Sequence, residues 1–203
     1  MARRILVLNP RSGDGKQSHR ARRLAVERGY DVRESERAGD TVDIAREAAV
    51  GEASLVAACG GDGTVNEVVR GVDEAGRLAE TTLGIVPTGT GNDFADNLGV
   101  RGVAHAFEVL ESGRERSLDL GSVRWTAAAS SAGLSDAPRR PFVNSCVFGL
   151  TAEASARTTR EAKRRLGVVA TSSRRFRGSG RSRDCGWRCG PVPGTTRCGP
   201  ATR

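Results

Sequence analysis

The feature that most constrains the fold of this chain is the alternation of short apolar segments with helix-like patterns. Residues 3–10, 30–35, 53–59 and 82–87 read as strands that end in polar or glycine-rich turns. Helix-like patterns follow at residues 17–29, 41–50, 64–72 and 103–113, with Asp40 expected to cap the second of them. Strands that alternate with helices in this way predict an α/β fold with a mostly parallel sheet covered on both faces.

Three loops rich in glycine and asparagine follow the first, third and fourth predicted strands, at residues 9–16, 60–63 and 88–93. Ligands of open α/β sheets bind outside the carboxyl ends of the strands. The three loops are therefore expected to form one binding site.

The loop "GGDGT" combines flexible backbone with the start of a helix. Gly60, Gly61 and Gly63 can adopt positive φ and let backbone N–H groups approach a ligand, and the helix directs its positive end to the same place. This predicts a phosphate site, and the alternative is a tight turn without a ligand. The loop is not a P-loop, because no lysine follows Gly63, and it is not a dinucleotide fingerprint, because Asn66 stands at the third glycine position.

Asp62 needs a separate explanation, because a carboxylate beside a triphosphate is repulsive unless it meets a cation or a hydroxyl group. We therefore interpret Asp62 as a candidate catalytic residue that meets a hydroxyl group, or as a ligand of a divalent cation held by the phosphates. Lys16 could neutralise phosphate charge or be an ordinary solvated lysine, and Asn92 could contact a ligand or cap the helix that follows it.

The segments "NPRSGDG", "GGDGTVNEVV" and "GIVPTGTGNDFA", in this order and spacing, resemble the diacylglycerol kinase catalytic family of lipid kinases, which includes sphingosine and ceramide kinases. The later "FVNSCVFGLTAEAS" is similar to the opening strands of that family's second domain. The resemblance covers about residues 3–170. It implies a phosphofructokinase-like, Rossmann-like nucleotide-binding domain followed here by the incomplete start of a β-sandwich domain.

The resemblance also implies the chemistry, which is transfer of the γ-phosphoryl group of ATP-Mg²⁺ to a lipid hydroxyl such as that of diacylglycerol. By position, the nucleotide would touch Asn9, Ser35, residues 60–66 and Thr90, and Asp62 would meet the Mg²⁺ of ATP. With the other polar residues of the three loops, the candidate ATP-binding residues are Asn9, Ser12, Ser35, Gly60, Gly61, Asp62, Gly63, Thr64, Val65, Asn66, Thr88, Thr90 and Asn92. The family's second domain supplies a carboxylate base in an Asp-Gly-Glu-like strand, and no such tripeptide occurs in this chain. We therefore expect impaired turnover. The alternatives are a nucleotide-binding fragment without catalysis and a NAD kinase-like enzyme.

The positive charge is concentrated at one end of the chain. Residues 171–203 contain eight arginines and one acid, a net charge of +7, whereas residues 1–170 contain 24 basic and 23 acidic side chains. This end segment lacks apolar periodicity and has few stacking groups, so we expect it to be disordered, not to bind nucleic acid, and to result from a frameshift or truncation. Its three cysteines are not spaced like a zinc site.

The expected organisation is an ATP-binding domain at residues 1–113, a partial second β-rich domain at 114–170 and a basic tail at 171–203. No apolar run is long enough to span a membrane, and no secretory signal is recognisable. A cytoplasmic protein, acting on lipid at the membrane surface, is therefore expected. A homodimer is left open.

Overall fold

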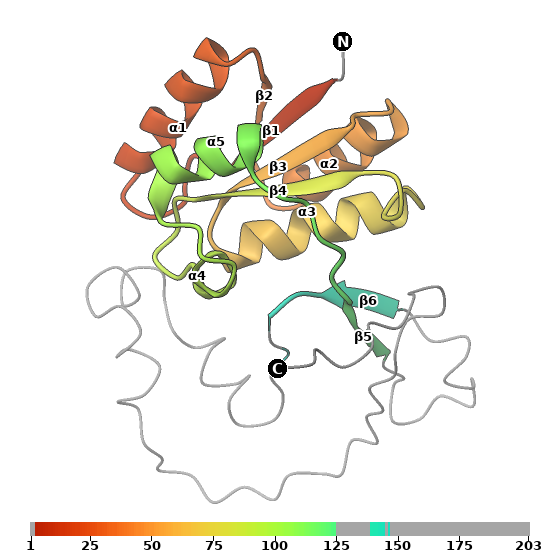
Figure 1. The fold of residues 1–203 in the computed structure, drawn as a ribbon. Helices are drawn as coiled ribbons and strands as arrows, with labels where there is room; N and C mark the ends of the chain where they lie inside the picture. The colour runs from red at the N-terminus through yellow and green to blue at the C-terminus, as the bar shows by residue number, and fades with distance from the viewer. Residues whose placement is uncertain (1–2, 125–138, 145, 147–203) are drawn as a thin grey trace, which may run out of the picture.

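The computed structural model describes residues 3–124, 139–144 and 146 of the 203-residue chain. These residues are the coloured ribbon of Figure 1. Four parallel strands form the main sheet, in the order β2-β1-β3-β4. The strands are β1 (Arg4–Leu8), β2 (Asp31–Glu34), β3 (Leu55–Gly60) and β4 (Thr82–Pro87).

Helices cover both faces of this sheet, which explains why its central strands are continuous apolar runs. Every residue of β3 is buried, as are residues 5–8 of β1. Helices α1 (Lys16–Glu27) and α5 (Gly102–Ser112) lie on one face, and α2 (Asp40–Val50) and α3 (Asp62–Glu74) lie on the other (Figure 1). The expected α/β fold with a parallel sheet is therefore confirmed.

Helices α2 and α3 pack closely because their contact faces are small. A Cβ atom added at Gly71 of α3 would lie 2.3 Å from the carbonyl oxygen of Val42 and 2.7 Å from the Cβ of Ala45. The close contact brings α3, and with it the loop that precedes α3, into a fixed position on the sheet.

The connections leave the carboxyl edge of the sheet in opposite directions. The chain passes from β1 to α1 and from β4 towards α5 on one face, but from β2 to α2 and from β3 to α3 on the other. Neighbouring strands β1 and β3 therefore send their loops to opposite faces, as do β3 and β4. Such switch points are where open α/β sheets bind ligands.

A second, two-stranded antiparallel sheet follows, formed by β5 (Gly121–Arg124) and β6 (Arg139–Phe142). It docks against α3. The Arg139 guanidinium contacts the Asp73 carboxylate, and the Val143 N–H donates to Asn66 Oδ1 over 2.9 Å. Val143 is buried in the same core as α2 and α3.

The structure also corrects element ends. Asp40 is not a cap: Gly39, at φ 97°, holds the N-cap position, and the Asp40 carboxylate accepts the N–H groups of Glu36 and Arg37. Within the expected second domain, the strands β5 and β6 are only four residues long each. Residues 147–170 of the expected second domain and the expected tail at 171–203 lie outside the described residues. No helix within the described part is both long and apolar enough to cross a bilayer.

Candidate functional site

The glycines of the site mainly allow its loops to touch one another. A Cβ atom at Gly61 would lie 2.8 Å from the Gly91 carbonyl oxygen, and one at Gly89 would lie 2.3 Å from the Gly61 Cα. A Cβ atom at Gly13 would lie 2.4 Å from the Thr88 carbonyl oxygen. The loops after β1, β3 and β4 therefore pack backbone against backbone at one edge of the sheet.

The glycines of "GGDGT" do not use positive φ. Gly13 and Gly15 have φ of 59° and 81°, but Gly60, Gly61 and Gly63 are absent from the positive-φ residues. A Cβ atom at Gly60 would lie 2.2 Å from Thr64 Oγ1, whereas one at Gly63 would meet nothing within 4 Å. Packing thus accounts for Gly60 and Gly61, and Gly63 alone of the three faces open space.

The first turn of α3 offers backbone donors beside this open space. Helix α3 begins at Asp62, two residues earlier than its apolar pattern predicts, and the Val65 N–H returns to the Gly61 carbonyl. The N–H groups of Gly63 and Thr64 have no acceptor within the described part of the chain. Unpaired N–H groups of a first helical turn attract anions.

The Asp62 carboxylate links two of the loops. It accepts the Asp93 N–H at Oδ2 over 3.1 Å and the Phe94 N–H at Oδ1 over 3.0 Å, so it caps helix α4 (Asp93–Asn97). The Asp62 N–H in turn donates to the Gly91 carbonyl over 3.3 Å. Asp62 thus has a structural partner that no sequence pattern indicates, because the contact joins positions 31 residues apart.

Asn92 is at the N-cap position of α4, as one interpretation of the sequence held, but its side chain does not cap the helix. The side chain instead forms two hydrogen bonds with the Gly89 backbone. Asn92 Oδ1 accepts the Gly89 N–H over 3.0 Å, and Asn92 Nδ2 donates to the Gly89 carbonyl over 2.8 Å. The loop 88–92 is consequently held by its own asparagine, and the Asp62 carboxylate takes over the capping.

Asn9 bridges the β1 and β3 sides of the switch point. Its Nδ2 donates to Thr64 Oγ1 over 3.2 Å, its Oδ1 accepts the Arg11 N–H, and its backbone N–H donates to the Cys59 carbonyl. Asn66 links the start of α3 to the residue that follows β6, because its Nδ2 donates to the Asp62 carbonyl while its Oδ1 accepts the Val143 N–H.

The remaining candidate residues differ in how accessible their side chains are. Ser35 is buried at the end of β2, where its Oγ donates to the Leu8 carbonyl over 3.5 Å. Val65 is 5% exposed in the core, so only its backbone can meet a ligand. Thr88 is buried against Cys59, whereas Thr90 is exposed and Ser12 half-buried.

Cys59 ends β3 directly before the loop and is fully buried. Burial raises the pKa of its thiol to about 12, although Thr88 Oγ1, 3.8 Å from the sulfur, opposes the shift. A thiol that does not ionise near neutral pH is a poor nucleophile and a poor metal ligand, so Cys59 is part of the core and not of the chemistry.

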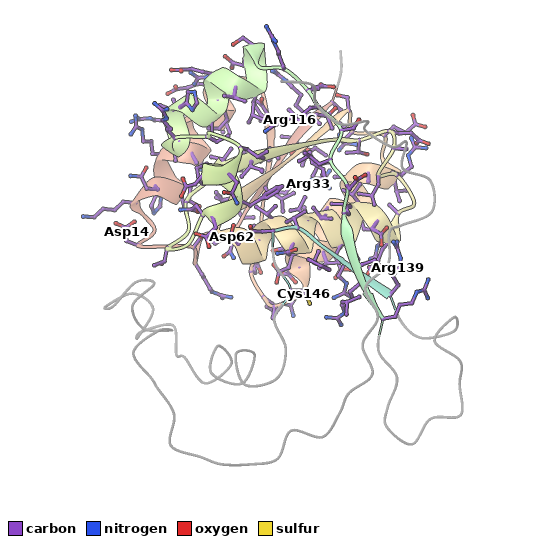
Figure 2. All side chains as sticks on the ribbon, turned by 60° about the horizontal axis from the view of Figure 1, so that its bottom comes forward. Asp14, Arg33, Asp62, Arg116, Arg139 and Cys146 are labelled. Atoms are coloured by element: carbon purple, nitrogen blue, oxygen red, sulfur yellow. The ribbon has the colours of Figure 1, made fainter. Side chains whose placement is uncertain are left out.

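A cavity of about 450 Å³ opens on the α1 and α5 side of the loop 88–92. It is lined by Thr88, Thr90 and Asn92 from the predicted site, and by Arg20 and Arg101, which the sequence analysis did not select. The chain contains so many arginines that nothing in the sequence distinguishes these two. Figure 2 shows Asp14, another lining residue, and Asp62 towards the left of the view, and Arg139 towards the right.

Together these observations define an open parallel α/β domain whose glycine-rich loops meet at the β1/β3 switch point. The chain belongs to the diacylglycerol kinase catalytic domain family, whose sequence profile matches residues 3–123. It is 38% identical over 130 residues to "Diacylglycerol kinase" of Bacillus subtilis (strain 168), an alignment that covers 61% of this chain and 42% of that protein. It is 31% identical over 169 residues to "Probable lipid kinase YegS-like" of Klebsiella pneumoniae (strain 342), covering 82% and 52%.

A solved structure, "A putative diacylglycerol kinase from Bacillus anthracis str. Sterne", superposes with a TM-score of 0.53 and 28% identity, over 60% of this chain and 45% of that one. The chain thus spans about half the length of the relatives it matches. The match confirms the family that the loop motifs indicated. It argues against the alternative of a NAD kinase-like enzyme.

Proposed function

We propose that this chain carries the nucleotide half of an ATP-dependent lipid kinase, which transfers the γ-phosphoryl group of ATP to a diacylglycerol-like hydroxyl. The observation that supports this best is the first turn of α3. There the N–H groups of Gly63 and Thr64 have no acceptor within the described residues, and a Cβ atom at Gly63 would meet nothing within 4 Å, in a chain that belongs to the diacylglycerol kinase family. The phosphates would bind these N–H groups, with Asn9 and the loop 88–92 on either side.

A magnesium ion fits this site only as a companion of the nucleotide. Within the described residues, no group of three or more histidine, cysteine, aspartate or glutamate side chains could hold a metal. Mg²⁺ in nucleotide sites is usually bound by phosphates, waters and one or two carboxylates. Asp62 would supply such a carboxylate, and the ion would neutralise charge on the transferred phosphoryl group.

The residues of the chain would act mainly by positioning. Each Asp62 oxygen accepts one N–H group and retains a further lone pair, so the carboxylate can meet a cation or an acceptor hydroxyl from a fixed place. This dual role is our proposal for its presence in the glycine loop. Asn9 and Thr64 would set the distance between the first and third loops.

We further propose the organisation expected from the sequence, with an ATP-binding domain at 1–113, the beginning of a β-sandwich within 114–170 and a separate tail at 171–203. The lipid would be met at a membrane surface by a cytoplasmic enzyme. Because the 203-residue sequence contains no Asp-Gly-Glu tripeptide, the chain tested alone is expected to bind ATP but to phosphorylate lipid poorly.

The test is a pair of measurements on the purified chain. Calorimetry should detect ATP-Mg²⁺ binding, and a radiolabel assay with diacylglycerol in mixed micelles should show phosphorylation far below that of a full-length relative. Absence of ATP binding by the folded chain would refute the nucleotide assignment, and efficient lipid phosphorylation would refute the expectation of impaired turnover.

A further inference from the structure

The segment 139–144, which contains β6, contacts α3 near both ends of that helix. Near the C-terminal end, the Arg139 guanidinium contacts the Asp73 carboxylate, whose side chain is only 13% exposed. Near the N-terminal end, the Val143 N–H donates to Asn66 Oδ1 over 2.9 Å. In Figure 1, β6 lies below α3, on the side away from the main sheet. The second sheet is thus attached along most of the length of α3.

The same segment also reaches α4. Asn97 Nδ2 donates to Asn144 Oδ1 over 3.3 Å. Val143 is buried in the core formed by α2 and α3, and Phe94 of α4 packs against that core. The segment therefore contacts both of the helices that the Asp62 carboxylate joins through its hydrogen bonds.

Asn66 has the side-chain chemistry that its two partners require. Its Oδ1 meets a backbone donor, the Val143 N–H, and its Nδ2 donates to a backbone acceptor, the Asp62 carbonyl, over 3.0 Å. A carboxylate could serve only the first partner, because it has no donor, and an alkyl side chain could serve neither. Asparagine is also a weak helix former, so its place in the second turn of α3 is not explained by helix propensity. Both ends of the Asn66 amide therefore bind the protein, and the side chain connects segment 139–144 to the start of α3.

We propose that Asn66 is a positioning residue that makes the shape of the "GGDGT" loop depend on the docking of residues 139–144. Its bond to the Asp62 carbonyl holds the first turn of α3, and with it the Asp62 carboxylate and the N–H groups of Gly63 and Thr64. Docking of the second sheet therefore raises nucleotide affinity, and bound nucleotide stabilises the docking by the same factor. The inference rests on the proposed function for the identity of the ligand, but not for the coupling itself.

The first measurement needs no ligand. Hydrogen exchange of the whole 203-residue chain is followed by NMR at two backbone amides. The Val143 N–H reports the docking, and the Phe94 N–H reports the position of the Asp62 carboxylate. Asp73→Asn weakens the contact with Arg139, so exchange at both amides should become about threefold faster or more, as expected when a local opening becomes easier.

Glu74→Gln is the matched control. Glu74 follows Asp73 directly, and its carboxylate pairs with Arg70 of the same helix over 2.7 Å. Each substitution removes one negative charge about 14 to 15 Å along the helix from Thr64, which is beyond the screening length at physiological salt. By charge alone, neither should lower ATP affinity. The coupling predicts that ATP-Mg²⁺ affinity, measured by calorimetry, falls about threefold in Asp73→Asn and in Arg139→Gln, and that it does not fall in Glu74→Gln.

Two substitutions at Asn66 separate its two hydrogen bonds. Asn66→Ala removes both, so the Val143 and Phe94 amides should exchange faster and ATP affinity should fall by about threefold or more. Asn66→Asp keeps an acceptor for the Val143 N–H but offers no donor to the Asp62 carbonyl. In that variant the Val143 N–H should stay protected, while the Phe94 N–H exchanges faster.

Several results would overturn the proposal. One is a Val143 N–H that is unprotected in the wild-type chain. Others are Phe94 exchange or ATP affinity that stays unchanged when Asp73→Asn has removed the Val143 protection, and Glu74→Gln acting like Asp73→Asn. Unchanged Phe94 exchange in Asn66→Asp would be equally decisive. If Asp73→Asn fails to fold, Arg139→Gln tests the same contact. A wild-type chain that binds no ATP refutes the proposed function, and the exchange of Phe94 still decides the coupling.

Discussion

Gly63 allows the proposed nucleotide site to be tested without disturbing the fold. A Cβ atom at this position meets nothing within 4 Å, while the neighbouring N–H groups of Gly63 and Thr64 are unpaired. A side chain introduced here would enter the open space where the proposed phosphate would lie. Gly63→Val is therefore expected to reduce ATP-Mg²⁺ affinity by at least tenfold, about 1.4 kcal/mol, and Gly63→Ala by less.

The free energy of unfolding of Gly63→Val and Gly63→Ala should rise, although their ATP affinity should fall. Gly63 lies in the first turn of α3 and does not have positive φ, so replacing it removes backbone freedom from the unfolded chain without strain. The gain is expected to be a few tenths of a kcal/mol. Gly61→Val is the contrasting variant. Its side chain would collide with the Gly91 carbonyl at 2.8 Å, and both stability and affinity should fall.

The assay is isothermal calorimetry of ATP-Mg²⁺ with each variant, accompanied by urea unfolding. Ala79→Val, on an exposed turn, controls for the added methyl groups. If ATP affinity is the same with glycine, alanine and valine at position 63, in variants that remain folded, then no phosphate lies against the first turn of α3. The assignment of the site would then be wrong.

Three further predictions follow from side-chain contacts. Asp62→Ala should destabilise the domain by about 1 kcal/mol in urea unfolding, because two N–H groups of α4 lose their cap; an unchanged midpoint would refute the capping role. Cys59 should resist thiol reagents at pH 8 until the protein unfolds, because burial raises its pKa to about 12; rapid labelling of the native protein, mapped by mass spectrometry, would contradict this. The N–H groups of Arg37 and Glu36 lower the pKa of Asp40 below 3.8, so its carboxylate stabilises the fold fully above that pH and the contribution disappears as the pH falls through the folded-state pKa. The stability difference between wild type and Asp40→Asn should accordingly be largest near neutral pH and shrink in acid, and a difference independent of pH would argue against the contact.

The sequence predicted those parts of the fold that depend on local pattern. The strand at 53–59 and the helix from 64 were recognisable because buried parallel strands are continuous apolar runs and the valines of α3 recur at helical spacing. The family was also recognisable, because its loop motifs are specific. The order of the strands and the switch point at β1/β3 came from the structure.

The contacts that complete the site were not predictable in this way. Asp62 caps a helix that begins 31 residues later, and Gly61 is a glycine because Gly89 and Gly91 lie against it. Asn92 and Asp40 are both residue types that commonly cap helices, yet the side chain of each bonds the backbone of the loop that precedes it. These hydrogen bonds and contacts depend on which segments lie together in three dimensions, and the local pattern of a single sequence does not show that.

The hydrogen bonds between the Asp62 carboxylate and the start of α4 have a consequence for the order in which the protein can fold. Residues 60–66 are made early during synthesis, but their loop cannot take its final shape until β4 has joined the sheet and residues 93 and 94 have reached the Asp62 carboxylate. Closing a contact over this length of chain costs entropy before it returns any stability. A nascent chain that ends within β4 would have a hydrophobic sheet already forming and no organised glycine loop. The final shape of residues 60–66 therefore depends on chain synthesised at least as far as residue 94.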